Sequence, residues 1–338
     1  MTKVLLTGGS GFIAAHVLDL LLKRGHNVIT TVRSEEKASK IRDAFRSSVS
    51  SGLLDFRIVE DIAQPGAFDE ALKIEGLEVV IHTASPFQLN VKDVKKDLLD
   101  PAINGTKGIL EAIKNGAPSV RKVIITSSFA AIIDINKAKD DPSIIYTEKS
   151  WNPITEAQAL ESSFFGYRAS KTFAERAAWE FVEKEKPNFT ISTINPPIVY
   201  GPIVHYLNSL DKLNTSNTFI YEIMSGKRKE DTLDSRPTLW VDVRDVALAH
   251  IKAFELEEAA GQRLFVTAGL KSMRDIADVI RKDFPELTAK LPNLNTTQPP
   301  ANGYKYDNSL TTKIVGPTQY SFEQSIDDTV KSLQSLGA

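Results

Sequence analysis

The sequence predicts an α/β fold, a Rossmann-type doubly wound parallel sheet with a smaller, discontinuous C-terminal lobe. Short apolar segments alternate with helical patterns through the first 195 residues, and this alternation requires parallel strands joined by right-handed crossovers. A glycine-rich turn joins the first apolar segment to the first helical one. After Pro196 the alternation stops, which indicates a second and smaller body.

Six apolar segments are expected to form strands, at residues 3–7, 27–32, 54–59, 79–83, 122–126 and 190–195. Each is almost wholly apolar, as in a strand that is covered on both faces. Apolar residues recur at helical spacing in 12–24, 97–113 and 169–185, which we expect to be helices. The long polar segment 134–161 predicts an excursion of the chain at the ligand side of the sheet.

The second half predicts fewer elements. Residues 241–254 have a helical pattern, 262–266 a strand pattern, and 272–284 a second helical pattern with Ser272 as its N-cap. Residues 289–303 are rich in Pro and Asn and are expected to form a surface loop. These pieces are expected to lie over the carboxyl edge of the sheet, where open α/β folds bind ligands.

Composition excludes several classes of function. The 41 Lys and Arg residues nearly balance the 43 Asp and Glu residues, so a net charge of −2 predicts no nucleic-acid partner and no anionic membrane partner. The absence of cysteine removes disulfides and thiolate chemistry, and the five histidines do not occur at metal-ligand spacing, so no metal is expected. No apolar run approaches the roughly 20 residues that cross a bilayer. We therefore expect a cytoplasmic protein.

Residues 7–14 read Thr-Gly-Gly-Ser-Gly-Phe-Ile-Ala and directly follow the first apolar segment. Gly8 permits a tight turn, Gly11 lets backbone N–H groups approach a pyrophosphate, and Ala14 lets helix and strand pack closely. Between a strand and a helix, this pattern predicts a dinucleotide site rather than a merely structural turn. The cofactor-binding residues expected here are Gly8, Gly9, Ser10, Gly11, Phe12 and Ile13.

The end of the second segment indicates which dinucleotide is bound. An acidic residue there favours NAD, because it accepts from the ribose 2′-hydroxyl and repels a 2′-phosphate. This chain has Arg33 instead, with Lys37 one turn further on, and both can pair with a phosphate. NADP(H) is therefore the expected cofactor. The alternative is that both cations are solvated charges beside Glu35 and Glu36.

The pattern Tyr167-x-x-x-Lys171 predicts a proton donor. Residues at i and i+4 share a helix face, so the ammonium group can lower the pKa of the phenol from about 10. Ser127 and Ser128 follow the fifth apolar segment, where a hydroxyl can hold a substrate carbonyl at the carboxyl edge of the sheet. An aromatic packed against a lysine stem and a serine capping a turn are the structural alternatives.

Together, the glycine turn, the two serines and Tyr167-x-x-x-Lys171 resemble the extended short-chain dehydrogenase/reductase family. Further segments look like one branch, the fungal NADPH-dependent carbonyl reductases related to plant dihydroflavonol reductases. These segments are 82–87, 150–153, 195–202, 213–216 and 241–247. The resemblance covers most of the chain. It implies hydride transfer from NADPH to an aldehyde, ketone or 2-oxo compound, which becomes an alcohol.

The resemblance also implies residue roles. Ser128 would hold the substrate carbonyl, Tyr167 would supply the proton, and Lys171 would stabilise the phenolate and hold the nicotinamide ribose. Asn104 would complete the catalytic set by holding a water that links the lysine to solvent. The other implied cofactor contacts are Asp61, Ile62, Thr83, Ala84, Ser85, Pro196, Val199 and Ser216.

We expect an NADP(H)-binding domain at 1–200 plus about 236–268, and a substrate-binding lobe at 201–235 plus 269–338. Apolar side chains near the carboxyl edge predict a pocket for an aryl or alkyl carbonyl. The nominated pocket residues are Phe87, Ser128, Phe129, Ile198 and Tyr206, with Phe164 as a further nomination. Core packing better explains Trp151 and Phe165.

Two rival functions stay open. An NAD-dependent sugar-nucleotide epimerase or dehydratase of the same superfamily would want an acid in place of Arg33 and a cluster of cations for a diphosphate. A non-catalytic NADPH-sensing protein would need only the glycine turn, whereas this chain also has Ser128, Tyr167 and Lys171. The sequence does not decide between a monomer and a homodimer.

Overall fold

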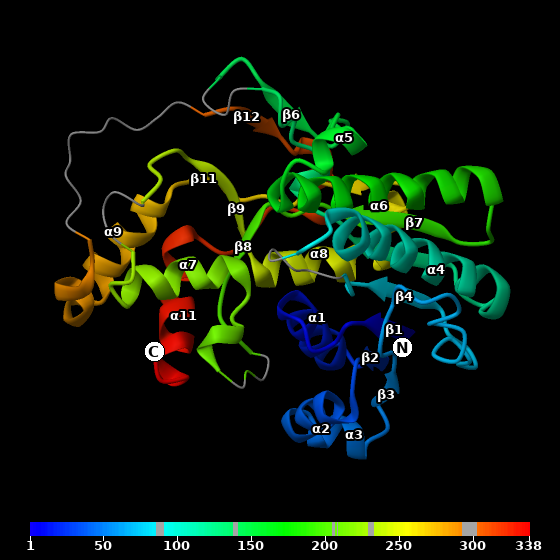
Figure 1. The fold of residues 1–338 in the computed structure, drawn as a ribbon. Coiled ribbons are helices and arrows are strands. Elements are labelled where there is room, and N and C mark those ends of the chain that lie inside the picture. Colours follow the sequence, from blue (N-terminus) through cyan, green and yellow to red (C-terminus); the bar gives the residue numbers. More distant parts are fainter. Residues whose placement is uncertain (86–90, 138–140, 205–206, 208, 229–232, 293–302) are drawn as a thin grey trace.

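The computed structural model describes residues 1–85, 91–137, 141–204, 207, 209–228, 233–292 and 303–338 (Figure 1). A seven-stranded sheet with the order β10-β7-β5-β4-β1-β2-β3 forms its centre. The strands are β1 (Lys3–Thr7), β2 (Asn27–Val32), β3 (Leu54–Ile58), β4 (Val79–His82), β5 (Lys122–Thr126), β7 (Thr190–Ile194) and β10 (Arg263–Leu264). All neighbours pair in parallel, which confirms the predicted doubly wound sheet.

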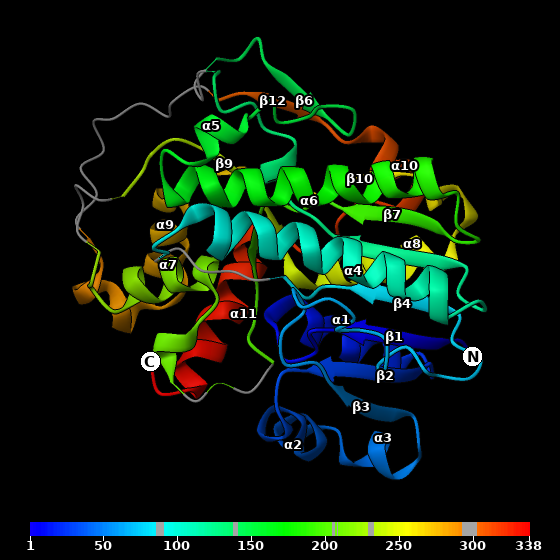
Figure 2. The same ribbon diagram turned by 45° about the vertical axis from the view of Figure 1, so that its right-hand side comes forward.

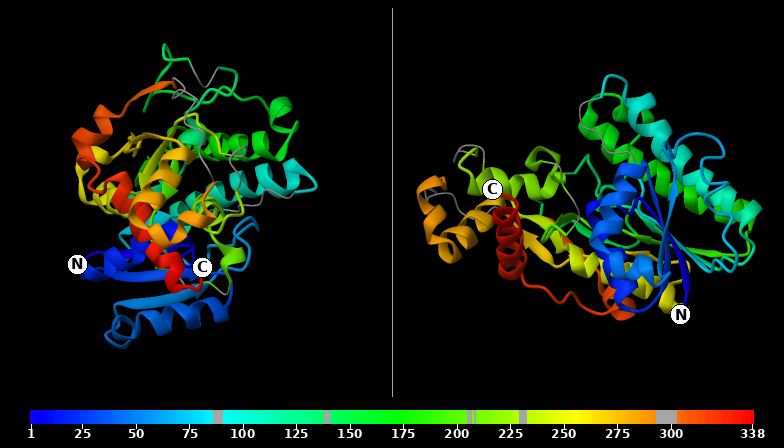
Figure 3. Two further views of the ribbon diagram at one scale, coloured as in Figure 1. Left: turned by 90° about the vertical axis from the view of Figure 1, so that its left-hand side faces the viewer. Right: turned by 90° about the horizontal axis from the view of Figure 1, so that it is seen from below.

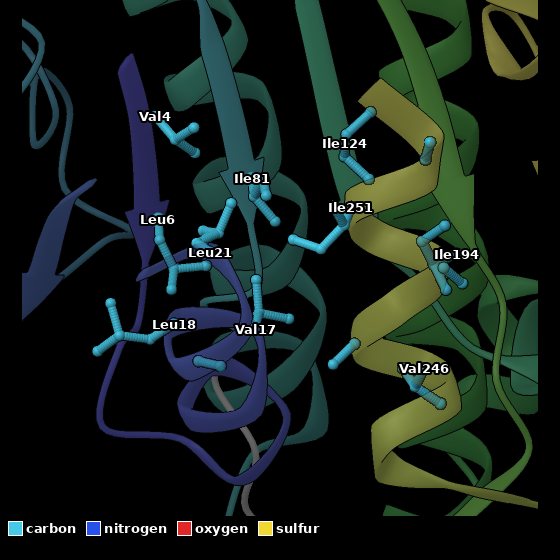
Figure 4. Packing of buried hydrophobic residues seen from close by; sticks show 14 of the residues in the cluster. Val4, Leu6, Val17, Leu18, Leu21, Ile81, Ile124, Ile194, Val246 and Ile251 are labelled. Atoms are coloured by element: carbon cyan, nitrogen blue, oxygen red, sulfur yellow. The ribbon is translucent and has the colours of Figure 1, made fainter. Parts of the chain in front are cut away.

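Helices cover both faces of this sheet. On one face lie α1 (Phe12–Lys23) and α8 (Val243–Glu255), and on the other α4 (Asp100–Gly116) and α6 (Ser163–Glu185) (Figure 2). Side chains alternate between the faces along each strand, so Val4 and Leu6 of β1 join the core under α1 and α8 (Figure 4). Leu5, between them, joins the core under α4 and α6. This two-sided burial explains the continuous apolar segments of the sequence.

The smaller lobe lies to one side of the sheet (Figure 3). Its core is enclosed by α7 (Thr215–Met224), α9 (Met273–Asp283), α11 (Phe322–Ser335) and a three-stranded sheet. The order of that sheet is β11 (Gly269–Lys271), β9 (Thr238–Asp242), β8 (Ile198–Tyr200). Its strands come from both of the expected domains, so the division of the chain stays a prediction.

A third, two-stranded sheet joins distant parts of the sequence. Strand β6 (Ile145–Thr147) pairs in parallel with β12 (Lys305–Asp307). Beside this pair, the buried Glu148 carboxylate accepts hydrogen bonds from the backbone N and the Oγ1 of Thr311, both at 2.8 Å. The shorter helices are α2 (Glu35–Ala44), α3 (Arg46–Ser50), α5 (Glu156–Ala159) and α10 (Ser309–Val315).

Several expected boundaries are corrected. Helix α6 begins six residues before the expected 169, because the Ser162 hydroxyl caps it by accepting from Phe165 N at 3.2 Å. The expected helix at 241–254 begins two residues late, because β9 extends to Asp242, whose carboxylate caps α8 at Arg244 N. The expected N-cap at Ser272 is confirmed, in a capping box.

Candidate active site

The turn between β1 and α1 is built from glycines. Gly8 has a φ of +75°, and its N–H donates to Thr31 Oγ1 at 3.1 Å. The N–H of Gly9 donates to Thr31 O at 3.0 Å, and a Cβ on Gly9 would lie 2.1 Å from Thr30 Oγ1. Gly11 is the N-cap of α1 and has no side chain with which to cap the helix. An uncapped helix N-terminus beside backbone N–H groups can bind a phosphate.

The other residues expected at this turn lie beside it. Ser10 is in the turn, while Phe12 and Ile13 begin α1 and pack on the core. A cavity of about 440 Å³ extends from the turn between α1 and α2, with Lys37 and Lys40 among its lining residues. The structure thus joins the glycine turn to one of the two cations expected to select NADP(H).

Arg33 and Lys37 are both exposed, directly beyond β2 and in the first turn of α2. Within the described ranges neither side chain forms an ion pair. Glu35, which could have neutralised them, pairs with Arg42 instead, and this hydrogen bond lowers the pKa of Glu35. The two positive charges therefore stay available to an anion.

Asp61 and Ile62 follow the next strand. Hydrogen bonds from the Gln64 side chain and from a backbone N–H lower the pKa of the Asp61 carboxyl, and the charge of Arg33 acts in the same direction. Ile62 is buried against α4 at Gly105, where an added Cβ would lie 3.2 Å from Ile62 Cδ1. Arg33 and Asp61 thus belong to one neighbourhood.

The ends of β1 and β4 are held together by Thr7. Its hydroxyl contacts His82 Nδ1 at 2.9 Å and accepts from Ala84 N at 3.1 Å, while Thr83 Oγ1 donates to Thr7 O at 2.5 Å. Ser85 then stands at the carboxyl edge of the sheet. These residues lie where a dinucleotide crosses a doubly wound sheet.

Ser128, Tyr167 and Lys171 meet at this edge. The hydroxyl groups of Ser128 and Tyr167 are hydrogen-bonded, and Lys171 Nζ donates to Ser85 Oγ at 3.1 Å. Burial lowers the pKa of Lys171 to about 8, whereas the charge of Glu175 raises it. Burial raises the pKa of Tyr167, and this outweighs its bond to Ser128. The expected lowering of the tyrosine pKa is therefore corrected, and at neutral pH the phenol keeps its proton.

The two adjacent serines have different partners. Ser128 is half-buried and bonded to Tyr167, and it also caps the turn Phe129–Ala131 by accepting from Ala130 N at 3.1 Å, whereas Ser127 is buried and donates to Glu175 Oε2 at 2.5 Å. Strand alternation separates them, since successive residues point to opposite sides. The geometry therefore assigns Ser128 to the open side of the site.

The sequence did not point to Glu175, one turn beyond Lys171 on α6. Its buried carboxylate accepts from Asn195 Nδ2 at 2.6 Å and from Thr193 Oγ1 at 3.1 Å, and it forms an ion pair with Arg263 Nε at 2.6 Å. This ion pair ties α6 to the outermost strand of the sheet. Removing one member of such a buried pair typically costs about 3–5 kcal/mol. The signal for it was the i+4 spacing from the lysine.

Behind Lys171 lies an inner cavity of about 20 Å³, enough for roughly one water. Ala102 and Thr106 of α4 line it, together with His82, whose pKa falls to about 3 because of burial and the nearby Lys171. Asn104 does not reach this cavity. It is exposed, because two residues along a helix turn a side chain by about 200°. The expectation that Asn104 holds a water for the lysine is therefore corrected.

The nominated pocket residues are only partly brought together. Phe129 is buried and stacks on Phe265, with ring centroids 5.2 Å apart, so its ring belongs to a packed aromatic cluster. Ile198 is half-buried and packs on the core of the smaller lobe. Phe87 and Tyr206 lie outside the described residues.

The remaining expected contacts lie between the sheet and the lobe. Ser216 Oγ donates to Val199 O at 2.5 Å, and Pro196 O accepts from Phe129 N at 2.8 Å. Trp151 stacks on the half-buried Arg263, whose Cζ lies 3.7 Å from the ring centroid, and this contact agrees with the expected role of Trp151 in packing.

Two further tests concern membranes and metals. Within the described ranges, none of the helices combines the length and apolarity that a membrane crossing requires. The same ranges contain no group of three or more His, Asp or Glu side chains placed to hold a metal ion.

The parallel sheet, its glycine turn and the Ser-Tyr-Lys cluster define a Rossmann-type protein with the site geometry of a short-chain dehydrogenase/reductase. The chain belongs to the NAD dependent epimerase/dehydratase family, whose model matches residues 4–267. The family resemblance read from the sequence is confirmed.

Individual relatives match over nearly the whole chain. The chain is 44% identical over 334 residues to the ketoreductase azaE of Aspergillus niger, which covers 98% of this chain and 97% of that protein. It is 37% identical over 343 residues to the NADPH-dependent methylglyoxal reductase GRE2 of Saccharomyces cerevisiae, which covers 98% of each. The crystal structure of Gre2 from Candida albicans in complex with NADPH matches with a TM-score of 0.91 at 38% identity and covers 100% of both chains.

Proposed function

We propose that this protein is an NADPH-dependent carbonyl reductase that converts aldehydes, ketones or 2-oxo compounds to alcohols. The observation that carries the proposal is the cluster of Ser128, Tyr167 and Lys171 at the carboxyl edge of the sheet, next to the glycine turn. The similarity to a ketoreductase and to an NADPH-dependent methylglyoxal reductase supports it.

The residues present fit the cofactor. The uncapped start of α1 and the close approach at Gly9 suit a pyrophosphate, and Arg33 and Lys37 suit a 2′-phosphate. Lys171 would hold the nicotinamide ribose. Bound NADPH supplies the hydride that the carbonyl carbon accepts.

The protein's own residues handle the oxygen and the proton. Ser128 donates a hydrogen bond to the carbonyl oxygen and holds it beside Tyr167. As negative charge develops on that oxygen, Tyr167 transfers its proton, and the cationic Lys171 stabilises the resulting phenolate. The raised pKa of Tyr167 keeps the phenol protonated before the reaction, as a proton donor requires.

We further propose that the protein acts in the cytoplasm on small carbonyl compounds. The half-buried Ile198 at the start of the lobe supports an apolar side to the substrate site. Arg33, directly after β2, disfavours an NAD-dependent sugar-nucleotide enzyme, because such an enzyme would have an acidic residue at this position.

Replacing the proton donor tests the proposal. Tyr167→Phe keeps the aromatic ring but removes the hydroxyl group that donates the proton. The value of kcat/KM for NADPH-dependent reduction should therefore fall by about 10²–10⁴. NADPH affinity, measured by fluorescence titration, should change little. Full activity in the variant would refute the mechanism. Tight NADPH binding by the wild type, without activity on any ketone, 2-oxoaldehyde or β-keto ester, would favour an NADPH sensor.

A further inference from the structure

Arg168 stands beside the proton donor and forms no ion pair with any carboxylate of the described residues. It follows Tyr167 in the second turn of α6 and is half-buried. Its guanidinium stacks on Phe164, with Cζ 4.6 Å from the ring centroid, and no described carboxylate lies within 4 Å of it. Burial lowers the pKa of Arg168 without bringing it near neutrality.

The surroundings do not neutralise this charge. The groups that act on it are phenols, those of Tyr146 and Tyr304 besides Tyr167. Burial raises the pKa of Tyr304 to about 12 and also raises that of Tyr146, so both phenols are uncharged at neutral pH. The Tyr146 and Tyr304 rings lie 5.2 Å apart in the aromatic cluster that contains Phe129, next to Ser128. The cation therefore lies between the catalytic pair and an aromatic wall.

Two other partly buried arginines of this protein each have a carboxylate partner. Arg263 has Glu175 at 2.6 Å, and Arg244 has Asp242 at 2.8 Å and Asp328 at 2.6 Å. Stacking alone is a weaker reason to bury Arg168, because its ring partner Phe164 is 49% exposed. A guanidinium that is withdrawn from water and left without an anion is suited to receive one from a ligand.

We propose that Arg168 binds the carboxylate of the substrate, so that the preferred carbonyl compounds are short oxo acids. This inference rests on the proposed reductase function. A carboxylate matches the planar fork of a guanidinium with two parallel hydrogen bonds. Consecutive residues leave a helix about 100° apart, but the Arg168 charge still acts on the Tyr167 phenol, so a single ligand would present its carbonyl and its carboxylate to two neighbouring groups. This requirement selects 2-oxo and 3-oxo acids, which become hydroxy acids.

A matched pair of substrates tests the inference, namely 3-oxobutanoate and its ethyl ester, with NADPH. In Arg168→Met, the ratio of kcat/KM for the acid to kcat/KM for the ester should fall by roughly 10- to 100-fold. Arg168→Lys keeps the charge without the fork and should restore part of the ratio. Lys184→Met, an exposed cation at the far end of α6, should leave the ratio unchanged.

A binding measurement separates this inference from the proposed function. Calorimetric titration with 3-hydroxybutanoate should give an affinity for wild type that is lost in Arg168→Met and kept in Lys184→Met. An acid-to-ester ratio that falls less than about threefold would overturn the inference, since it would mean that Arg168 only tunes Tyr167. If neither substrate is reduced but the carboxylate still binds through Arg168, the reductase function fails and the anion site stands.

Discussion

At the scale of single residues, the proposed selectivity for NADPH depends on Arg33 and Lys37, which form no ion pair within the described ranges. Glu35 lies two residues from both Arg33 and Lys37, yet its carboxylate is held by Arg42. The ion pair within α2 thus engages one of the two acids beside these cations, and Glu36, the other acid, forms no ion pair with Arg33 or Lys37. Solvated but unpaired cations at this position favour the phosphorylated dinucleotide.

Arg33→Asp should therefore reverse the preference between the two dinucleotides. The new carboxylate repels a 2′-phosphate and accepts from a free 2′-hydroxyl, so the ratio of kcat/KM for NADPH to that for NADH should fall by about 10²-fold or more. Steady-state kinetics with both cofactors measure it. Arg46→Asp makes the same charge change on an exposed part of α3 and should leave the ratio as it is. An unaltered ratio in Arg33→Asp would remove this residue from the cofactor site.

The residues of the site could be predicted where their spacing is local. Tyr167 and Lys171 share a helix face, and Ser128 follows two residues after a strand, so the pattern alone predicts that they lie near one another. Asn104 was carried over from the resemblance and proved exposed. Arg168 could not be singled out, because the sequence does not reveal whether an arginine has a carboxylate partner elsewhere in the fold.

At the scale of elements, the β1–α1 turn requires a residue without a Cβ at Gly9. A Cβ on Gly9 would lie 2.1 Å from Thr30 Oγ1, and that hydroxyl is fixed by its own bond to Leu6 O at 2.9 Å. The neighbour is thus a short side chain held in the core of the sheet. Relief would require β1 and β2 to separate.

Gly9→Ala should therefore lower the free energy of unfolding by about 1–3 kcal/mol and weaken NADPH binding. Gly108→Ala is the matched control, because a Cβ at that position in α4 meets nothing within 4 Å. It should be neutral or stabilising by up to about 1 kcal/mol, as expected for Ala over Gly in a helix. Urea unfolding measures both variants. Equal stability of the two would show that the turn can adjust.

The elements differ in how well a pattern can predict them. The strands that are covered on both faces are continuous apolar segments, and their positions follow from the sequence. Strands β6, β8, β11 and β12 have three residues each, and their partners are distant in the chain, so no local period marks them. The last two residues of β9 fall within the predicted helix 241–254, because an apolar strand runs directly into an apolar helical face.

At the scale of the whole molecule, a buried acid connects the sheet to the smaller lobe. Asp245 lies in the first turn of α8, and its carboxylate accepts from Gln319 N at 2.8 Å and Tyr320 N at 3.3 Å, just before α11. Burial raises the pKa of Asp245 to about 6, and the nearby Asp242 acts in the same direction, although the two backbone bonds oppose it.

Stability should therefore depend on pH through Asp245. The folded protein binds this proton more tightly than the unfolded chain, in which the pKa of aspartate is about 3.9. The stabilisation is complete below about pH 4 and is lost as the pH rises through about 6. Relative to Asp245→Asn, wild type should thus become steadily less stable between pH 4 and 6.5 in urea unfolding, with no further change above. A difference that is constant over this range would contradict the raised pKa.

The pairing of β6 with β12 has a consequence for how the chain folds as it is made. Residues 145–147 can find their partner only after residues 305–307 have left the ribosome. Until then the polar excursion beyond β5 has an open edge, and the Glu148 carboxylate lacks Thr311. The five strands β1, β2, β3, β4 and β5, which include the strand before the cofactor turn, are complete by residue 126, whereas the wall beside Tyr146 and Tyr304 is closed by almost the last tenth of the chain. During synthesis, the part of the site that binds the dinucleotide can thus form before the part that faces the substrate.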